Sequence, residues 1–373
     1  MNSNLIAIIF ALLAALFYGA GIPFSKILLS TIPPTFLASF LYLGAGFGIG
    51  VIYALNFKKQ THLKSLEKAD LPYILGMIIL DIIAPILLMF GILKGSGANA
   101  ALLSNFEIVA TTLIALAIFK EFISFRLWVG IILICLSSVI LSFESAENFV
   151  FSIGSLLVIM ASICWGFENN CTRKISHKNT YEIVTLKGIF SGLGAFLTAV
   201  ILGESLSEIK YIATALILGF FAYGLSIFLY IKAQKYLGAA KTSAYYATTP
   251  FIGAALSLMI LQENLSEHYF LALAIMLLGS CVVVYDTLIT DHSHAHTHVF
   301  THTHGGDTHT HTIMHSHHHK HGINANKHSH THKFELNLHE NLSNLQSQSI
   351  KNLSNLDKNS SNSNANSTKK DDK

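Results

Sequence analysis

Long apolar segments alternate with short polar breaks over the first 290 residues of the chain. Each segment is close to the roughly 20 residues that a helix needs to cross the hydrocarbon core of a bilayer. The pattern therefore predicts an all-α polytopic membrane protein with ten transmembrane helices. Their expected ranges are 5–24, 34–55, 71–93, 98–119, 127–143, 149–167, 183–203, 211–231, 242–261 and 269–287.

The apolar region contains an internal repeat. Ala98, Ala101 and Glu121 recur as Ala240, Ser243 and Glu263, each 142 residues later. A second anchor is the run Phe17-Tyr18-Gly19, echoed by Cys164-Trp165-Gly166. Because five helices per copy is an odd number, the second copy is expected to lie upside down relative to the first. Inverted repeats of this kind are common in secondary transporters, whose substrate site lies between the halves.

The charges between the segments predict the orientation. If both termini are cytoplasmic, the even-numbered loops carry twelve Lys or Arg residues and the odd-numbered loops carry three, Lys26, Lys94 and Lys210. Basic residues concentrate in cytoplasmic loops of membrane proteins. We therefore expect both termini to be inside, in a bacterial inner membrane.

Composition agrees with this interpretation. Hydrophobic residues make up 52% of the chain and charged residues 12%, about half the usual share for a soluble domain. The net charge of +3 is an average over unlike regions and gives no reason to expect a nucleic-acid partner. The sequence contains no GxxxxGK[ST] motif and no catalytic constellation. An enzyme or an ATP-driven pump is therefore not expected.

The halves resemble the EamA family of the drug/metabolite transporter superfamily. The features that carry the resemblance are the paired endings AIFKE (Ala117–Glu121) and MILQE (Met259–Glu263), together with Pro250 in TTPFIGAALS. It covers about residues 5 to 288. The first half departs from the family pattern, with no proline near Glu107 and no arginine in FLASFLYLGAG. The resemblance implies a ten-helix transporter without implying a substrate.

Two carboxylates fall inside apolar segments, Asp81 in the third and Glu107 in the fourth. A charge at the bilayer centre costs roughly 2.5–3.5 kcal/mol on insertion scales, so an unneeded one is seldom kept. Both are candidates for proton coupling or for binding a cationic solute. The structural alternative is a protonated carboxyl group that hydrogen-bonds to a neighbouring helix.

Polar side chains recur at helical spacing on three predicted helices, and such stripes are expected to face the bundle interior. Single Ser or Thr residues are more often simple packing residues between membrane helices. Taken together, the stripes favour a transport cavity. Its expected lining is Asp81, Ser104, Glu107, Thr111, Glu168, Asn169, Tyr223, Thr242, Tyr246 and Thr249.

Further polar residues leave alternatives open. Glu168 and Asn169 are expected near the cytoplasmic end of the sixth helix, as a cavity mouth or as an ordinary helix end. Lys187 can extend to the inner membrane surface, or pair with Glu168 or Asp81. Gly19, Gly21 and Pro23 favour a broken or kinked first helix. Glu121 and Glu263 are expected at membrane edges, where capping or surface pairing is the simplest role.

The C-terminal region differs from the rest. Residues 292–332 contain 16 histidines, many of them in HxH repeats. In an extended chain HxH places two imidazoles on one side, where they can share a metal ion such as Zn²⁺, Ni²⁺, Co²⁺ or Cu²⁺. A neutral low-complexity expansion is the alternative. The candidate ligands are His292, His294, His296, His298, His302, His304, His309, His311, His315, His317, His318, His319 and His321.

The expected domains are two five-helix repeats at 1–145 and 146–290, a His-rich cytoplasmic segment at 291–335 and an Asn/Ser/Lys-rich tail at 336–373. The His-rich tail and the last segment are expected to be disordered.

The leading hypothesis is a secondary transporter that moves a small metabolite by alternating access, with proton coupling through Glu107 or Asp81. The alternatives are a transition-metal transporter that uses the tail to buffer its ion, and a metal sensor with a membrane anchor. No cofactor is required. The expected partners are the lipid bilayer, a small solute and a divalent transition metal, and a homodimer is left open.

Overall fold

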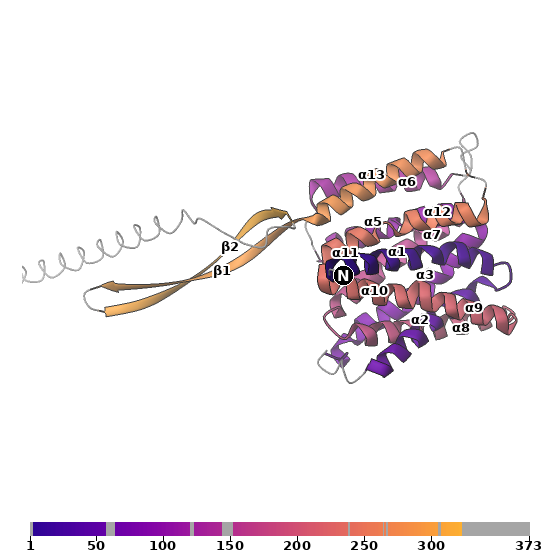
Figure 1. Ribbon diagram of the computed structural model, residues 1–373, viewed down its shortest axis with the longest axis horizontal. Coiled ribbons are helices and arrows are strands. Elements are labelled where there is room, and N and C mark those ends of the chain that lie inside the picture. The colour runs from indigo at the N-terminus through magenta and orange to yellow at the C-terminus, as the bar shows by residue number, and fades with distance from the viewer. Residues whose placement is uncertain are drawn as a thin grey trace, which may run out of the picture. The chain divides into compact units, whose positions relative to one another are not determined.

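The computed structural model describes residues 3–56, 64–119, 123–143, 152–237, 239–263, 265, 268–304 and 307–322. A bundle of helices is followed in the chain by two paired strands (Figure 1). A 3-10 turn, η2 (Lys68–Asp70), precedes α3, and a π-helical turn, η3 (Phe220–Leu225), joins α9 to α10. The helices are α1 (Ser3–Leu28), α2 (Pro34–Asn56), α3 (Leu71–Lys94), α4 (Gly97–Leu103), α5 (Phe106–Phe119), α6 (Phe125–Leu141), α7 (Ile153–Ile175), α8 (Thr180–Ile201), α9 (Ile209–Gly219), α10 (Ser226–Leu237), α11 (Ala239–Tyr246), α12 (Thr249–Leu261) and α13 (Tyr269–Leu288).

Eight helical stretches in the described part of the chain are long and apolar enough to cross a membrane. The two other predicted segments correspond to α6, a shorter apolar helix, and to α7. The predicted range 149–167 is wrong for α7, which begins at Ile153 because Ser152 caps its first turn by accepting a hydrogen bond from the Ser155 amide. The helix then continues through the polar run from Glu168 to Lys174, so these residues belong to its body.

Two predicted single helices are each broken in two. The range 98–119 becomes α4 and α5, and the range 242–261 becomes α11 and α12. In the second pair Pro250 lies in the first turn of α12, where its missing N–H cannot continue the hydrogen-bonding of α11. In the first pair the Ser104 hydroxyl donates to the Ala101 carbonyl at 2.6 Å, and Asn105 donates to Ser280 at 2.8 Å. Such bonds compete with a continuous helix.

The expected break in the first helix is not found. α1 runs without interruption from Ser3 to Leu28, with Pro23 inside it. Its small residues instead allow close packing, because a Cβ atom on Gly19 would lie 2.9 Å from the Thr249 carbonyl oxygen. The lack of a side chain at Gly19 therefore allows α1 and α12 to pack closely.

The most extensive helix contacts join the two halves of the chain: α2 with α8, α3 with α7, and α6 with α13. Figure 1 shows α6 and α13 side by side at one edge of the bundle. Large apolar side chains such as Phe125 and Ile201 are more than four-fifths exposed, at 81% and 83%. Such an apolar exterior is expected of a surface that meets lipid.

The His-rich segment differs from the expected disorder. β1 (Ile289–His304) pairs antiparallel with β2 (Asp307–Gly322), and the register places His292 opposite His319, His294 opposite His317, and His296 opposite His315. Alternating residues rich in Thr, with Gly-Gly in the sequence between the strands, favour a hairpin. The predicted tail at 336–373 lies outside the described residues.

Candidate functional site

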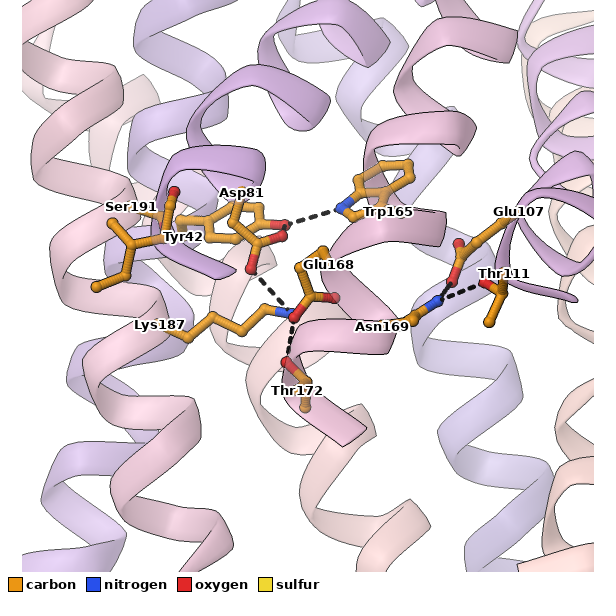
Figure 2. A network of polar contacts seen from close by, with 11 residues as sticks. Tyr42, Asp81, Glu107, Thr111, Trp165, Glu168, Asn169, Thr172, Lys187 and Ser191 are labelled. Carbon is orange, nitrogen blue, oxygen red and sulfur yellow. Dashed lines mark hydrogen bonds and ion pairs between the residues drawn. The ribbon is translucent and has the colours of Figure 1, made fainter. Parts of the chain in front are cut away.

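A lysine paired with two carboxylates lies between three helices. The Lys187 Nζ atom on α8 is 2.9 Å from Asp81 Oδ2 on α3 and 3.0 Å from Glu168 Oε1 on α7. The Asp81 side chain is fully buried, and that of Glu168 is nearly so. Both pairings that the sequence left open are therefore present together (Figure 2). We call these three residues the ionic triad.

Hydrogen bonds from neighbouring side chains also reach both carboxylates of the triad. The Tyr42 hydroxyl donates to Asp81 Oδ1 at 3.0 Å, and Trp165 Nε1 donates to the Tyr42 oxygen at 3.3 Å. The Thr172 hydroxyl donates to Glu168 Oε1. Because buried charges are costly unless paired and hydrogen-bonded, these contacts offset part of the cost of burying the three side chains.

Glu107 is held by an amide. Asn169 Nδ2 donates to Glu107 Oε1 at 2.6 Å and to Thr111 Oγ1 at 3.2 Å, linking α7 to α5 (Figure 2). The two helices approach closely here, since a Cβ on Gly166 would lie 2.6 Å from that of Ala110. No ion pair to Glu107 is found among the described residues. Its carboxyl group therefore keeps hydrogen-bonding capacity for a solute or a proton.

The helix break determines where Glu107 lies. Because α4 ends at Leu103 and α5 begins at Phe106, Glu107 falls in the first turn of α5. The break therefore places Glu107 directly beside the turn at Ser104 and Asn105.

Aromatic rings connect the two carboxylate clusters to α1 and α11. The Tyr223 ring, on η3, lies 5.7 Å from that of Tyr42 and 5.4 Å from that of Tyr18. Tyr246, on α11, lies 5.9 Å from Tyr18 and 5.0 Å from Tyr230. The Tyr18–Tyr223 and Tyr230–Tyr246 pairs are edge-to-face, and the other two pairs are tilted.

The other predicted lining residues have different surroundings. Ser104 donates within α4, and the Thr249 hydroxyl donates to the Tyr246 carbonyl at 2.6 Å, so both stabilise the helix breaks. Thr242 is buried on α11. The thirteen candidate metal-ligating histidines lie on β1 and β2, and their side chains are outside the described residues. Elsewhere in the described part, no group of three His, Cys, Asp or Glu residues could hold a metal ion.

Sequence reasoning missed three aromatic residues of this region, Tyr18, Tyr42 and Trp165. Tyr18 and Trp165 were visible as equivalent positions of the repeat, and that equivalence was the available signal. Tyr42 carried none, because it lies in an ordinary apolar run and its partner Asp81 is on another helix.

Comparison with known proteins assigns the chain to a family. The model of the EamA-like transporter family matches residues 5–143 and 152–285, which together span most of the chain. The chain belongs to the EamA-like transporter family. The resemblance seen in the sequence is therefore confirmed, and the two matched ranges correspond to the two halves of the helical bundle.

Two relatives illustrate the similarity. An uncharacterized transporter of Methanothermobacter thermautotrophicus (strain Delta H) is 25% identical over 291 residues, covering 73% of this chain and 84% of the relative. A protein of known crystal structure matches with a TM-score of 0.55 and 14% identity, covering 74% of this chain and 94% of the other. The latter similarity concerns the fold alone. Together with the apolar helices, the family makes this chain a multi-pass membrane transporter.

Proposed function

We propose that the chain is a secondary-active transporter that moves a small metabolite across a bacterial inner membrane by alternating access. Ten spanning helices in two inverted five-helix repeats would form its membrane domain, with both termini in the cytoplasm. The observation that carries this proposal is the buried polar cluster between the helices, made of the ionic triad and of Glu107 with Asn169.

The position of this cluster supports a transport role. Its residues come from α3, α5, α7 and α8, and so from both halves of the chain. The Lys187 side chain keeps 18% of its surface accessible although it pairs with two buried carboxylates. Inverted-repeat transporters bind their solutes between the halves, beside interrupted helices. Glu107 lies beside one such interruption.

α6 and α7 are assigned as the two remaining spans. α7 has 23 residues and is about 35 Å long at 1.5 Å per residue, enough to cross the hydrocarbon core. Its polar second half has partners inside the bundle, since Glu168 pairs with Lys187 and Asn169 binds Glu107. The polar side chains of α7 thus contact other helices instead of lipid, so this helix can span the membrane without exposing them to the hydrocarbon core.

Proton coupling through Glu107 or Asp81 is part of the proposal. Glu107 lacks a cationic partner among the described residues, so it can exchange a proton without breaking an ion pair. Asp81 exchanges only if Lys187 shifts toward Glu168. Glu107 is thus the better-placed carrier.

Purified protein in proteoliposomes tests this role. Solutes found by comparing the metabolites and metals of cells with and without the gene would be offered to the wild type and to Glu107→Gln and Asp81→Asn. We expect both variants to lose pH-dependent transport, whereas Glu208→Gln, which removes an exposed carboxylate, should match the wild type. Unchanged transport rate and pH dependence in both variants would exclude coupling through either residue.

A metal-binding cytoplasmic tail is a second proposal. The register of β1 and β2 supports it, because directly opposed residues of an antiparallel pair have Cα atoms only about 4.5–5.5 Å apart. Zn²⁺, Ni²⁺, Co²⁺ or Cu²⁺ would suit such histidine pairs. If the tail instead delivers a transported metal, the chain is a transition-metal transporter, and a flux assay with the metal alone separates the two.

A further inference from the structure

Among the described residues, the two broken helices form an extensive interface at one end. α4 packs against α12, where a Cβ on Gly97 would meet Leu261 at 3.0 Å and Ser257 at 3.2 Å. A Cβ on Gly253 would likewise lie 3.2 Å from that of Ala101. The other halves of the same helices, α5 and α11, form no comparable interface within the described ranges.

This difference breaks the symmetry of the repeat. The offset of 142 residues makes α4 the counterpart of α11, and α5 the counterpart of α12. The interface between α4 and α12 therefore has an expected counterpart between α11 and α5, and no comparable interface joins the described residues of these two helices. The same asymmetry is seen for α1, which contacts α3 and α4, whereas its counterpart α7 forms no comparable interface with α10 or α11 in the described parts of those helices.

Two charged side chains hold the packed end. Glu263, just beyond α12, accepts hydrogen bonds from the Ser96 hydroxyl at 2.9 Å and from the amides of Gly97 and Ala98 at 2.8 and 3.0 Å. Lys26, near the end of α1, donates to the carbonyls of Ile92 and Gly95, both at 2.6 Å. The carboxylate thus meets the N-terminus of α4, and the ammonium meets the C-terminus of α3. Both placements match the charge of the helix ends.

We infer that the structure is the inward-open conformer of the transport cycle, and that Lys26 and Glu263 form a clamp that keeps its external end closed. The inference rests on the proposed alternating access and on the orientation predicted from loop charges. To open the external end, the turn between α3 and α4 must leave both side chains. In the opposite conformer the equivalent positions, Arg173 of the second repeat for Lys26 and Glu121 of the first repeat for Glu263, would take over at the cytoplasmic end.

A matched contact on the same face provides a control. Glu204, after α8, accepts from the amides of Thr35 and Phe36 at 3.2 and 3.0 Å, and so also caps a helix of the other half. It joins α2 to α8, which are counterparts of each other in the repeat. An interface between counterparts keeps its geometry when the halves exchange conformations. A Cβ on Gly46 would lie 2.5 Å from the Ile189 amide nitrogen, which shows how closely this pair is packed. The hydrogen bonds of Glu204 to Thr35 and Phe36 should therefore persist in both conformers.

Hydrogen–deuterium exchange on the full-length protein in lipid nanodiscs tests the clamp. In Glu263→Gln and Lys26→Gln we expect exchange in residues 92–103 to be roughly tenfold faster, the size of effect expected from losing a charged cap. Exchange in α10 and α11, at the opposite end, should become slower, because opening one end closes the other. Glu204→Gln should speed exchange only near residues 34–37.

The direction in which the exchange rate of α10 and α11 changes decides between a clamp and an ordinary helix cap. If exchange in α10 and α11 is unchanged or faster in both clamp variants, the contacts are ordinary caps and the inference is wrong. Wild-type flux is measured separately in proteoliposomes. If the wild type shows no transport but the clamp variants exchange faster in residues 92–103 and slower in α10 and α11, the proposed function is rejected and the clamp is supported. If the wild type transports but the variants lack these exchange changes, the clamp alone is rejected.

Discussion

At the scale of single residues, the ionic triad shows how a membrane helix can carry buried charge. One ammonium group serves two carboxylates, Tyr42 donates to the Asp81 oxygen that Lys187 does not reach, and Thr172 donates to the Glu168 oxygen that Lys187 also contacts. The desolvation of such groups costs several kcal/mol each, so the arrangement stabilises the fold only while every member is present. The net charge of the triad is negative whenever both carboxylates are ionised.

Removal of the Lys187 ammonium group should therefore strongly lower the free energy of unfolding. Lys187→Met leaves Asp81 and Glu168 facing each other without a cation, and we expect a loss of about 3–5 kcal/mol of unfolding free energy. Thermal or denaturant unfolding in detergent would measure it. Lys210→Met is the control, because the Lys210–Glu208 pair is 62% and 68% exposed and such pairs contribute about 0–1 kcal/mol. Equal effects of the two substitutions would contradict a buried charge role for Lys187.

The sequence identified Asp81 and Glu107 from their depth in apolar segments, because charge inside a hydrophobic run is visible without a structure. It could not choose the partners of Lys187, since Asp81 and Glu168 lie on different helices. Tyr42 was missed for the same reason. A tyrosine in an apolar run becomes a site residue only through a tertiary contact, here with Asp81.

At the scale of helices and turns, apolar length located the membrane segments, and local chemistry decided their interruptions. Pro250 gives a visible reason for the break before α12. The break at Ser104 and Asn105 depends on Ser280, which is 175 residues further along the chain. A sequence pattern cannot reveal such a partner. The polar end of α7 was misjudged because its polarity is balanced by other helices, not by water.

The turn between α7 and α8 offers a pH test outside the spanning helices. Lys178 Nζ lies 2.7 Å from Glu67 Oε1 and 3.3 Å from Asp70 Oδ2, which ties this turn to the residues before α3. The hydrogen bond to Glu67 raises the pKa of Lys178, and the hydrogen bond to Asp70 adds to the effect. A raised folded-state pKa means that the contact stabilises fully below the unfolded value of about 10.4 and is lost as the pH rises through the folded value.

We therefore expect the difference in thermal midpoint between wild type and Lys178→Met to be constant from neutral pH to about pH 10 and to shrink above it. Unfolding scans across alkaline pH would measure it. Lys210→Met, on the other face, serves as the reference for general alkaline effects. A difference that disappears below pH 9 would show that the ammonium is not the stabilising group.

At the scale of the whole molecule, the repeat makes a prediction about residues on the opposite face from the clamp. Glu121 is the counterpart of Glu263 by the offset of 142 and lies outside the described residues. If it closes the cytoplasmic end in the other conformer, Glu121→Gln should favour the conformer described here. Hydrogen–deuterium exchange in residues 92–103 should then be slower than in the wild type. Faster exchange, as expected of Glu263→Gln, would contradict a reciprocal pair.

Deletion of residues 291–373 separates the tail from transport. We expect the shortened protein to keep the metabolite flux of the full chain and to lose Zn²⁺ or Ni²⁺ binding in calorimetric titration. The membrane domain carries the whole polar cluster, so its transport does not require the histidines. Loss of metal flux on deletion, with metal transport by the full chain, would favour the metal-transporter alternative.

The close packing of α2 on α8 also bears on mechanics. If the two halves rock against each other, this pair of equivalent helices lies on the rotation axis, where displacements are smallest. Lys187 directly precedes Gly188, whose Cβ position is 2.5 Å from the backbone of Gly46, so the ammonium is anchored beside that pivot. Parts farther from the pivot travel farther, and the turn between α3 and α4 is among them. The Lys187 ammonium group would then keep its position through the transport cycle, while the solute moves past it.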